Sequence, residues 1–166
     1  MKEIFVRLER CLGCKSCELA CAVEHSATKH LFAAIAETPR PRQRIYVESG
    51  RAHKMPLTCR HCEEAPCIDA CITGAMHRDL RGVVTNVGGV QECIGCWMCL
   101  MVCPYGVVGR QVETKLALKC DLCPDRETPA CVEACPTKAL VYTEAEGFSR
   151  LVRQEAASTL AISLGR

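Results

Sequence analysis

The sequence predicts an α+β fold made of two small modules of one repeated pattern, followed by a C-terminal amphipathic helix. Three observations support this prediction. The chain carries 16 cysteines in repeated groups, strand-like patterns alternate with single-turn helix patterns, and aromatic residues make up 4% of the chain. A chain of 166 residues with so few large apolar side chains buries a thin core and needs additional cross-links. We therefore expect the cysteines, and whatever they bind, to form the centre of each module.

The cysteines fall into four quartets that leave none unassigned, and every quartet ends in C-x3-C. The third quartet reads C-x2-C-x2-C-x3-C-P, whereas the second widens its middle spacing to x4 and the fourth to x7. The quartets are Cys11, Cys14, Cys17 and Cys21; Cys59, Cys62, Cys67 and Cys71; Cys93, Cys96, Cys99 and Cys103; and Cys120, Cys123, Cys131 and Cys135. A repeat this regular indicates one chemistry used four times.

The third quartet has the ligand spacing of a bacterial 4Fe–4S site. Three thiolates separated by two residues each can wrap one cubane cluster from a single loop, and Gly95 lets the backbone approach the inorganic sulfides. Cys103 lies one helical turn further on and can reach a neighbouring cluster, while Pro104 stops this turn from continuing as a helix. We therefore predict four 4Fe–4S clusters as cofactors, with all sixteen cysteines as metal ligands.

Zinc and disulfide bonds are the alternative uses of so many cysteines. Zinc sites pair two C-x2-C knuckles across a longer insert, often with histidine, whereas here every quartet ends in C-x3-C. Disulfides require an oxidising compartment, and the charged N-terminal segment does not have the pattern of a secretory signal. No apolar run approaches the length of a membrane span, so we expect a cytoplasmic protein.

The formal net charge of +2 changes once clusters are counted. Each cluster with its four thiolates adds about −2, so a chain with four clusters would carry roughly −6. Lys15, Arg60 and Lys119 each neighbour a ligand cysteine and are candidates for raising cluster potentials. Basic patches with interleaved aromatic residues are missing, which argues against a nucleic-acid partner.

Short elements connect the quartets. Alternating apolar residues predict strands, and apolar residues three or four apart predict helices. Ser49 and Gly50 predict a hairpin turn, and Pro39 and Pro41 end the second helix. In chain order we expect a strand at 3–8, helices at 15–24 and 31–36, a hairpin of 44–48 with 54–58, and strands at 82–85, 116–119 and 139–143. The repeated order of strand, cysteine loop, helix and strand is that of a bacterial ferredoxin unit, present twice.

The C-terminal segment lies beyond the last cysteine. Its apolar residues recur at helical spacing, and Gly165 is a candidate for the residue that ends the helix. These apolar residues are Phe148, Leu151, Val152, Ala156, Leu160 and Leu164. The helix either folds back on the core of its own chain or docks on a partner.

The histidines and the single tryptophan are interpreted as supporting residues. None of the five histidines is expected to bind metal, because the thiolates fill all the positions. His61 lies inside the second quartet and either donates a hydrogen bond to a cluster or is an ordinary surface or loop histidine. Trp97 is expected to pack over its cluster.

With these spacings, the chain resembles the four-cluster electron-transfer subunits of molybdenum and tungsten oxidoreductases, including the iron–sulfur subunits of hydrogenases and of carbon monoxide dehydrogenase. Segments 21–26 (CAVEHS) and 39–42 (PRPR) are most similar to subunits paired with carbon monoxide dehydrogenase or tungsten aldehyde oxidoreductase. The resemblance implies a polyferredoxin domain over residues 1–145 and a helix for docking or assembly over residues 146–166. The resemblance further implies that this domain consists of two interleaved modules. One comprises residues 1–30 and 110–145, and the other lies between them, at about 55–109.

The resemblance also implies that quartets one and four share two clusters, and that quartets two and three share the other two. Each cluster takes three cysteines from one quartet and the last cysteine of the partner quartet. The implied ligand sets are Cys11, Cys14, Cys17 with Cys135; Cys120, Cys123, Cys131 with Cys21; Cys59, Cys62, Cys67 with Cys103; and Cys93, Cys96, Cys99 with Cys71.

The function that the resemblance implies is electron transfer without catalysis. The sequence offers no nucleophile–base pair, no nucleotide loop and no open metal position, so no catalytic residue is assigned. One partner would be a large catalytic subunit of the tungsten or molybdenum aldehyde oxidoreductase or carbon monoxide dehydrogenase type, and the other a flavoprotein or ferredoxin. A free polyferredoxin and the iron–sulfur subunit of a formate dehydrogenase or hydrogenase are the alternatives. Copies could also self-associate into filaments through the C-terminal helix.

Overall fold

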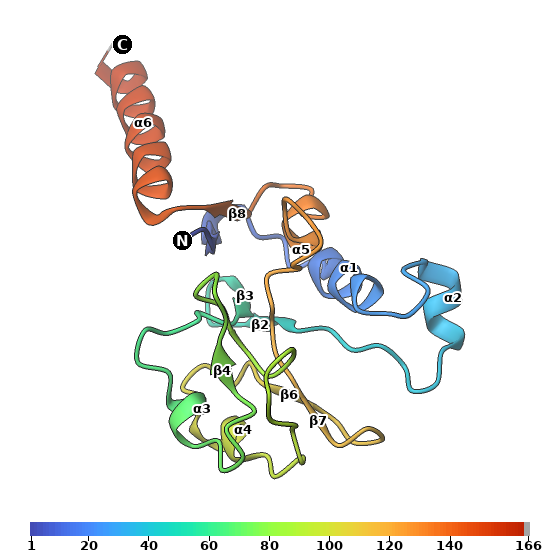
Figure 1. The fold of residues 1–166 in the computed structure, drawn as a ribbon. Coiled ribbons are helices and arrows are strands. Elements are labelled where there is room, and N and C mark those ends of the chain that lie inside the picture. The colour runs from blue at the N-terminus through green and yellow to red at the C-terminus, as the bar shows by residue number, and fades with distance from the viewer. Residues whose placement is uncertain (165–166) are drawn as a thin grey trace.

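The computed structural model describes residues 1–164, and within them every sheet has two strands (Figure 1). The antiparallel pairs are β1 with β8, β2 with β3, β4 with β5 and β6 with β7. Short helices lie between these pairs, and the long helix α6 leaves the body at its C-terminal end (Figure 1). This mixture of small sheets and helices confirms the α+β prediction.

The first and last strands of the body pair with each other. β1 (Glu3–Val6) lies antiparallel to β8 (Leu140–Thr143), with Ile4 opposite Tyr142. The side chains of Ile4 and Leu140 are buried, because alternate residues of each strand face the core. The pairing joins the beginning of the chain to the segment that follows its last cysteine.

The helices beside this pair come from the first and fourth quartets. α1 (Ser16–Glu24) packs against α5 (Ala130–Glu133), and a short 3-10 helix, η1 (Leu8–Arg10), leads from β1 to the first cysteine loop. The hairpin of β2 (Ile45–Ser49) and β3 (Lys54–Thr58) covers α1 and β1. The hairpin prediction is confirmed within one residue at each end.

The second and third quartets form a separate packing unit. It contains one helix from each quartet, and α3 packs against α4. Its elements are α3 (Pro66–Asp69), β4 (His77–Arg78), β5 (Val84–Thr85), α4 (Met98–Val102), β6 (Gly109–Gln111) and β7 (Leu116–Leu118).

Many of the buried residues belong to one of two hydrophobic cores, and both cores contain cysteines. The first core consists of Ile4, Cys17, Cys21, Ile45, Val47, Val83, Cys120, Leu122, Cys131, Val132, Cys135, Ala139 and Leu140. The second core consists of Ala65, Met76, Val84, Cys99, Val108 and Ala117. Partly buried cysteines pack against each: Cys11 and Cys59 against the first, and Cys67, Cys71, Cys93 and Cys103 against the second. Sulfur therefore supplies much of the packing that aromatic residues supply in other small domains.

Helix α2 (Leu31–Ala36) lies at the edge of the molecule, after α1 (Figure 1). Ala34 is buried, while Phe32 is 76% and Ile35 is 61% exposed. The bounds predicted from the sequence are confirmed. The extended segment after α2 carries the chain back to β2.

Helix α6 (Ala145–Leu164) begins against the body and then projects away from it (Figure 1). The ring of Phe148 stacks on Phe5 of β1 with 4.7 Å between centroids. Leu160 and Ile162 are 62% and 68% exposed. The prediction that the helix folds back on its own core is thus right for its first turns and wrong for its later ones. The helix end predicted at Gly165 lies outside the described residues.

Some elements differ from the prediction for local reasons. β4 and β6 were not expected, because ladders of two and three residues are too short to show alternation. The strand predicted at 82–85 begins at Val84, since Gly82 turns the chain with a φ of 81°. Within residues 1–164, no helix combines the length and the apolarity that crossing a bilayer requires.

Candidate iron–sulfur sites

All sixteen cysteines lie in the described part of the chain as free thiols, so the disulfide alternative finds no support in the structure. Cys14 and Cys96 are exposed, and seven others are fully buried. The buried cysteines are Cys17, Cys21, Cys99, Cys120, Cys123, Cys131 and Cys135. The thiols nevertheless come together in space, within and between quartets.

The first group lies beside the β1–β8 pair. One small cavity is lined by four sulfur-bearing residues, Cys11, Cys14, Cys17 and Cys135, together with Gly13 and backbone that follows the last cysteine. Burial raises the pKa of Cys17 to about 11, and the neighbouring Cys135 raises it further. The last cysteine of the fourth quartet therefore lies among the first three cysteines of the first.

The second group reverses this arrangement. Burial raises the pKa of Cys131 far above its ordinary value, and the thiolates of Cys120, Cys21 and Cys123 add to this shift. Burial likewise raises the pKa of Cys21 to about 12, with contributions from Cys120 and Cys123. The last cysteine of the first quartet therefore lies among the first three cysteines of the fourth.

Quartets two and three show the same exchange. Burial raises the pKa of Cys67, and Cys59 and Cys103 add to it. For Cys99, burial raises the pKa to about 11, and the neighbouring thiolates that add to it are Cys93, Cys67, Cys96 and Cys71. Thiols of the second and third quartets therefore lie near one another.

These buried sulfur groups fit iron. A thiolate without a cation is destabilised by burial, which is why the pKa values rise, whereas a bound metal supplies the missing positive charge. The imidazole of His61 gives a second test. Its Nε2 atom is buried and has no hydrogen-bond partner within residues 1–164. Buried donors are rarely left unpaired, and the sulfur atoms of a cluster are acceptors that could pair it.

The cysteine loops share one backbone feature. In every quartet, the residue before the second cysteine has a left-handed conformation: Gly13 and Gly95 with φ of 70°, His61 with 45° and Leu122 with 59°. Glycine tolerates this conformation, whereas other L-residues are strained in it. At Gly95 space also matters, because a Cβ atom would lie 2.6 Å from the carbonyl oxygen of Lys115.

Backbone N–H groups stabilise several of the sulfur atoms. The Sγ atoms of Cys21, Cys71 and Cys135 accept hydrogen bonds from the N–H groups of Arg44, Met76 and Ala139, at 3.2, 3.3 and 3.2 Å respectively. Each of these cysteines closes its quartet. Such hydrogen bonds favour the thiolate and tune the potential of the metal that it binds.

His61 lies in a loop, as one of its two interpretations expected, but its side chain is buried, at 4% exposure, and not on the surface. Its Nδ1 accepts a hydrogen bond from the N–H of Val84 at 3.2 Å, which places the hydrogen of the neutral ring on Nε2. Burial, together with the positive charge of Lys119, lowers the pKa of His61 to about 3. The ring is therefore neutral near physiological pH.

The three basic residues beside ligand cysteines differ in position. Lys15 is largely exposed and pairs with Glu18. Arg60 lies over the ring of Phe5 and donates to the carbonyl of Ile4. Lys119 alone of the three reaches a ligand sulfur with its side chain.

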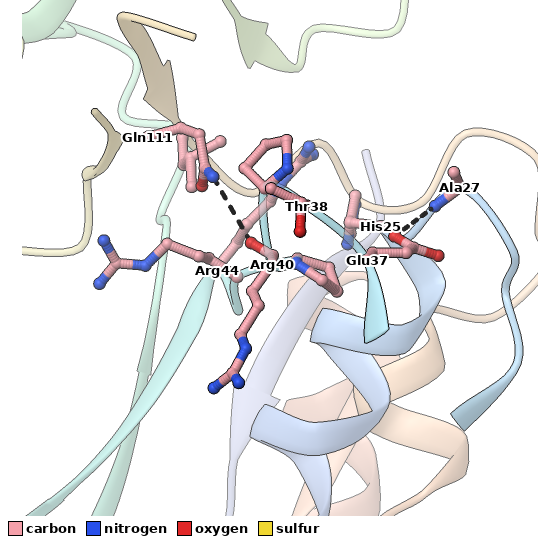
Figure 2. Close-up of a pocket in the computed structure, with 11 residues that line it drawn as sticks. His25, Ala27, Glu37, Thr38, Arg40, Arg44 and Gln111 are labelled. Carbon is pink, nitrogen blue, oxygen red and sulfur yellow. Dashed lines mark hydrogen bonds between the residues drawn. The ribbon is translucent and has the colours of Figure 1, made fainter. Parts of the chain in front are cut away.

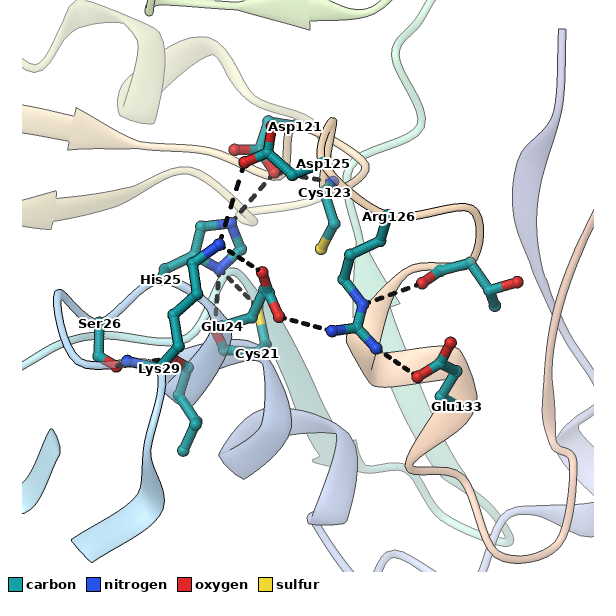
Figure 3. A network of polar contacts seen from close by, with 12 residues as sticks. Cys21, Glu24, His25, Ser26, Lys29, Asp121, Cys123, Asp125, Arg126 and Glu133 are labelled. Atoms are coloured by element: carbon teal, nitrogen blue, oxygen red, sulfur yellow. Dashed lines mark hydrogen bonds and ion pairs between the residues drawn. The ribbon is translucent and has the colours of Figure 1, made fainter. Parts of the chain in front are cut away.

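A polar network that the sequence analysis did not identify surrounds Cys21 (Figure 3). His25 Nδ1 contacts the carbonyl oxygen of Cys21 at 2.7 Å and its sulfur at 3.7 Å, and Nε2 contacts Asp121 at 3.1 Å. Arg44 forms an ion pair with the other oxygen of Asp121. Burial opposes ionisation of Asp121, but the hydrogen bond from His25 and the charge of Arg44 lower its pKa.

This network joins the first and fourth quartets. His25, Asp121 and Cys123 have ligand atoms close enough to hold a metal ion. Asp121 is already paired with Arg44, and it also accepts the N–H of Cys123 at 3.0 Å. We therefore interpret the carboxylate as support for the cysteine loop. Asp121 follows Cys120 directly, and this adjacency is the signal that could have identified it.

Family models match both parts of the chain. Residues 51–145 match the model described as a 4Fe-4S dicluster domain, and residues 8–24 match one described as a 4Fe-4S binding domain. The chain belongs to the 4Fe-4S dicluster domain family. The chain is therefore an iron–sulfur protein, and the comparisons do not support the zinc alternative.

Relatives of this dicluster protein are named for electron transfer. An iron–sulfur protein of Rhodospirillum rubrum is 42% identical over 176 residues, covering 96% of this chain and 91% of that protein. The electron transport protein HydN of Escherichia coli strain K12 is 38% identical over 164 residues, covering 89% and 91%. The thiosulfate reductase electron transfer subunit PhsB of Salmonella typhi is 34% identical over 173 residues, covering 95% and 88%. The dicluster protein is thus an iron–sulfur protein of the electron-transport type.

The dicluster protein also has a surface pocket of about 340 Å³ beside the network (Figure 2). Arg40, Arg42 and Arg44 line it, and His25 closes one side. Gln111 donates to the carbonyl of Arg40 across it at 3.5 Å. No cysteine lines this pocket, so it is separate from the thiol clusters.

Proposed function

We propose that this chain is a non-catalytic electron-transfer subunit that holds four clusters and connects a catalytic subunit to a second redox partner. When bound, each cluster takes up and releases one electron at a time. The observation that carries the proposal is that twelve of the sixteen thiols belong to, or pack against, two cores, and that each core draws on more than one quartet. The electron-transfer names of HydN and PhsB support it.

The proposed ligand sets follow the thiol neighbours described above. In each set, three cysteines come from one quartet and the fourth from its partner quartet. The sets are Cys11, Cys14, Cys17 and Cys135; Cys120, Cys123, Cys131 and Cys21; Cys59, Cys62, Cys67 and Cys103; and Cys93, Cys96, Cys99 and Cys71. Support comes from the cavity around the first set and from the mutual effects of the thiols on their pKa values.

The proposed modules correspond to the two cores. Residues 1–30 and 110–145 would hold the first and second ligand sets, and residues of about 55–109 the other two. Ile45 and Val47 of the hairpin and Val83 also pack into the first core. We therefore extend the first module to include the hairpin strand β2.

The proposed catalytic partner is a large oxidoreductase subunit. PhsB carries the name of a thiosulfate reductase electron transfer subunit, and this relationship favours a subunit of a larger oxidoreductase over a free polyferredoxin. Tungsten aldehyde oxidoreductase and carbon monoxide dehydrogenase remain our candidates from the sequence, and formate dehydrogenase or hydrogenase the alternatives. A flavoprotein or a ferredoxin would be the second partner.

Helix α6 supports a subunit role. Beyond its first turns it exposes apolar side chains, among them Leu160 and Ile162, to solvent. A freely diffusing carrier gains nothing from such a projection, whereas a subunit can use it to dock on a catalytic partner or on a second copy.

Elemental analysis tests the cofactor content. Protein prepared without oxygen should contain about sixteen iron and sixteen acid-labile sulfide per chain, the content of four cubane clusters. Zinc in place of iron, or iron without sulfide, would refute the proposal.

Affinity purification from native extract tests the subunit role. A tagged chain should co-purify with a large oxidoreductase subunit and should reoxidise that subunit when its substrate is supplied. A chain that elutes alone at its monomer size, with its full iron content, would instead identify a free polyferredoxin.

A further inference from the structure

Lys119 is a buried lysine in direct contact with a ligand cysteine. Its side chain is 3% exposed, and its Nζ lies 2.7 Å from the Sγ of Cys59. The same Nζ donates to the carbonyl of Val84 at 2.7 Å and lies 3.4 Å from Nδ1 of His61. Three partners thus hold the ammonium group in one position.

Cys59 differs in this respect from the other ligand cysteines. The sulfur atoms of Cys21, Cys71 and Cys135 accept backbone N–H groups and lie near a histidine or threonine side chain. Within residues 1–164, Cys59 is the cysteine whose sulfur contacts a lysine, and it also accepts the N–H of His61 at 3.3 Å. A lysine–sulfur contact of this kind therefore occurs at one of the four ligand sets in the described part of the chain.

The contact lies where the two cores meet. Cys59 belongs to the second quartet, yet it packs against the first core. Burial raises the pKa of Cys120, and the thiolate of Cys59 adds to this shift, so the two sulfur atoms are neighbours. Lys119 directly precedes Cys120 in the chain while its side chain bonds to Cys59.

We propose that Lys119 raises the reduction potential of the centre bound by Cys59, and so makes that centre the favoured electron acceptor at the junction of the two modules. This inference rests on the proposed function. Reduction adds one negative charge to a centre, and a fixed ammonium at 2.7 Å from its ligand sulfur stabilises that charge. The electron comes from the neighbouring centre of the other module, which is oxidised as the Cys59 centre is reduced, and no bond or proton changes.

Redox titration of Lys119→Met in the full chain with its clusters tests the inference. The variant keeps the length of the side chain and removes its charge. One of the one-electron transitions followed by electron paramagnetic resonance should move to lower potential by ~59 mV or more. A shift of this size corresponds to a tenfold change in the ratio of oxidised to reduced centres. The other three transitions should stay in place.

Lys15→Met is the matched control, because Lys15 neighbours the ligand Cys14 but is exposed and paired with Glu18. It should leave all the transitions unchanged. Lys119→Arg keeps the positive charge, so its transition should stay close to the wild-type potential. Unchanged transitions in Lys119→Met with full iron content would overturn the inference.

A second uncharged variant covers the case in which methionine disturbs the site. Lys119→Gln keeps N–H donors for Val84 and should show the same downward shift. Loss of iron from both uncharged variants would overturn the inference in favour of a purely structural role for Lys119. Wild-type protein without four clusters would refute the proposed function itself, and its iron content is measured before any variant is titrated.

Discussion

Arg7 and Glu155 form an ion pair, with 2.5 Å between Nη2 and Oε2, that ties helix α6 to the segment following the first strand. Arg7 is 9% exposed, and its hydrogen bond to Glu155 raises its pKa despite burial. Arg10 pairs with the other oxygen of Glu155 at 3.0 Å. One carboxylate therefore ties the middle of helix α6 to the body of the molecule.

Glu155→Ala should loosen α6 without affecting the clusters. The variant removes both arginine contacts, so the junction between β8 and α6 should be cleaved several-fold faster in limited proteolysis, because local opening becomes easier. Glu146→Ala, in the exposed first turn of α6, is the control and should match wild type. Equal cleavage rates for the two variants would show that the ion pairs contribute nothing to docking.

Removal of residues 156–166 should separate assembly from cofactor binding. The contacts of α6 with the body involve Phe148 and Glu155, both of which the truncated chain keeps. Iron content and visible absorbance should equal those of the full chain, while co-purification with the partner subunit, or self-association, should be lost. A truncated chain that still binds its partner would contradict the docking role.

Gly95→Ala should damage the third cysteine loop more than Gly106→Ala. Both glycines have positive φ, so an added Cβ strains each by about 1–2 kcal/mol. At Gly95 the Cβ would also lie 2.6 Å from the carbonyl oxygen of Lys115, whereas at Gly106 it meets nothing within 4 Å. Gly95→Ala should lower iron content and the melting temperature, and Gly106→Ala should change the melting temperature alone. Equal effects would show that strain, and not space, limits this loop.

Leu122→Gly should destabilise the protein, although glycine suits the left-handed backbone there. Relief of the backbone strain at this position should stabilise the folded state by about 1–2 kcal/mol. Loss of a leucine that is 4% exposed in the first core costs more, about 2–5 kcal/mol by analogy with leucine-to-alanine changes. The free energy of unfolding should fall by about 2 kcal/mol, the difference between the middles of these two ranges, in anaerobic denaturant titrations. Leu12→Gly, at an exposed position, should change little, and a stabilised Leu122→Gly would disprove the assignment of its packing role.

Paired cysteine substitutions test the exchange of ligands between quartets. Cys11→Ala with Cys135→Ala should perturb one centre, because both residues belong to one proposed set. Cys11→Ala with Cys21→Ala should perturb two centres, although both residues lie in one quartet. Counting the altered signals by electron paramagnetic resonance, with iron analysis, distinguishes the two patterns. The reverse result would assign each cluster to a single quartet.

The sequence predicted most of what repeats in this molecule. The C-x3-C motif places two cysteines one helical turn apart, which predicts the short helices. Alternating apolar residues at 3–8 and 139–143 predict strands, which the structure shows as β1 and β8. Both signals are local, because the residues that produce them are neighbours in the chain.

Contacts between distant segments could not be predicted in the same way. Lys119 reaches Cys59 across 60 positions, and Arg44 offers its backbone N–H to Cys21 across 23. Adjacency to a cysteine singled out Lys15, Arg60 and Lys119 equally. Burial and the direction of each side chain, which depend on the packed fold, separate Lys119 from the other two.

The pairing of β1 with β8 also determines the order in which the protein can mature during translation. Domains emerge from the ribosome N-terminus first, so the earliest strand must wait for residues 140–143 before it has a partner. The helices and strands of the unit around α3 and α4 have all been synthesised by residue 118, so they can form earlier than the β1–β8 pair. Until synthesis ends, the thiols of the first loop stay without their later neighbour and are open to oxidation. Maturation in the cell should therefore depend on protection of the nascent chain from oxygen.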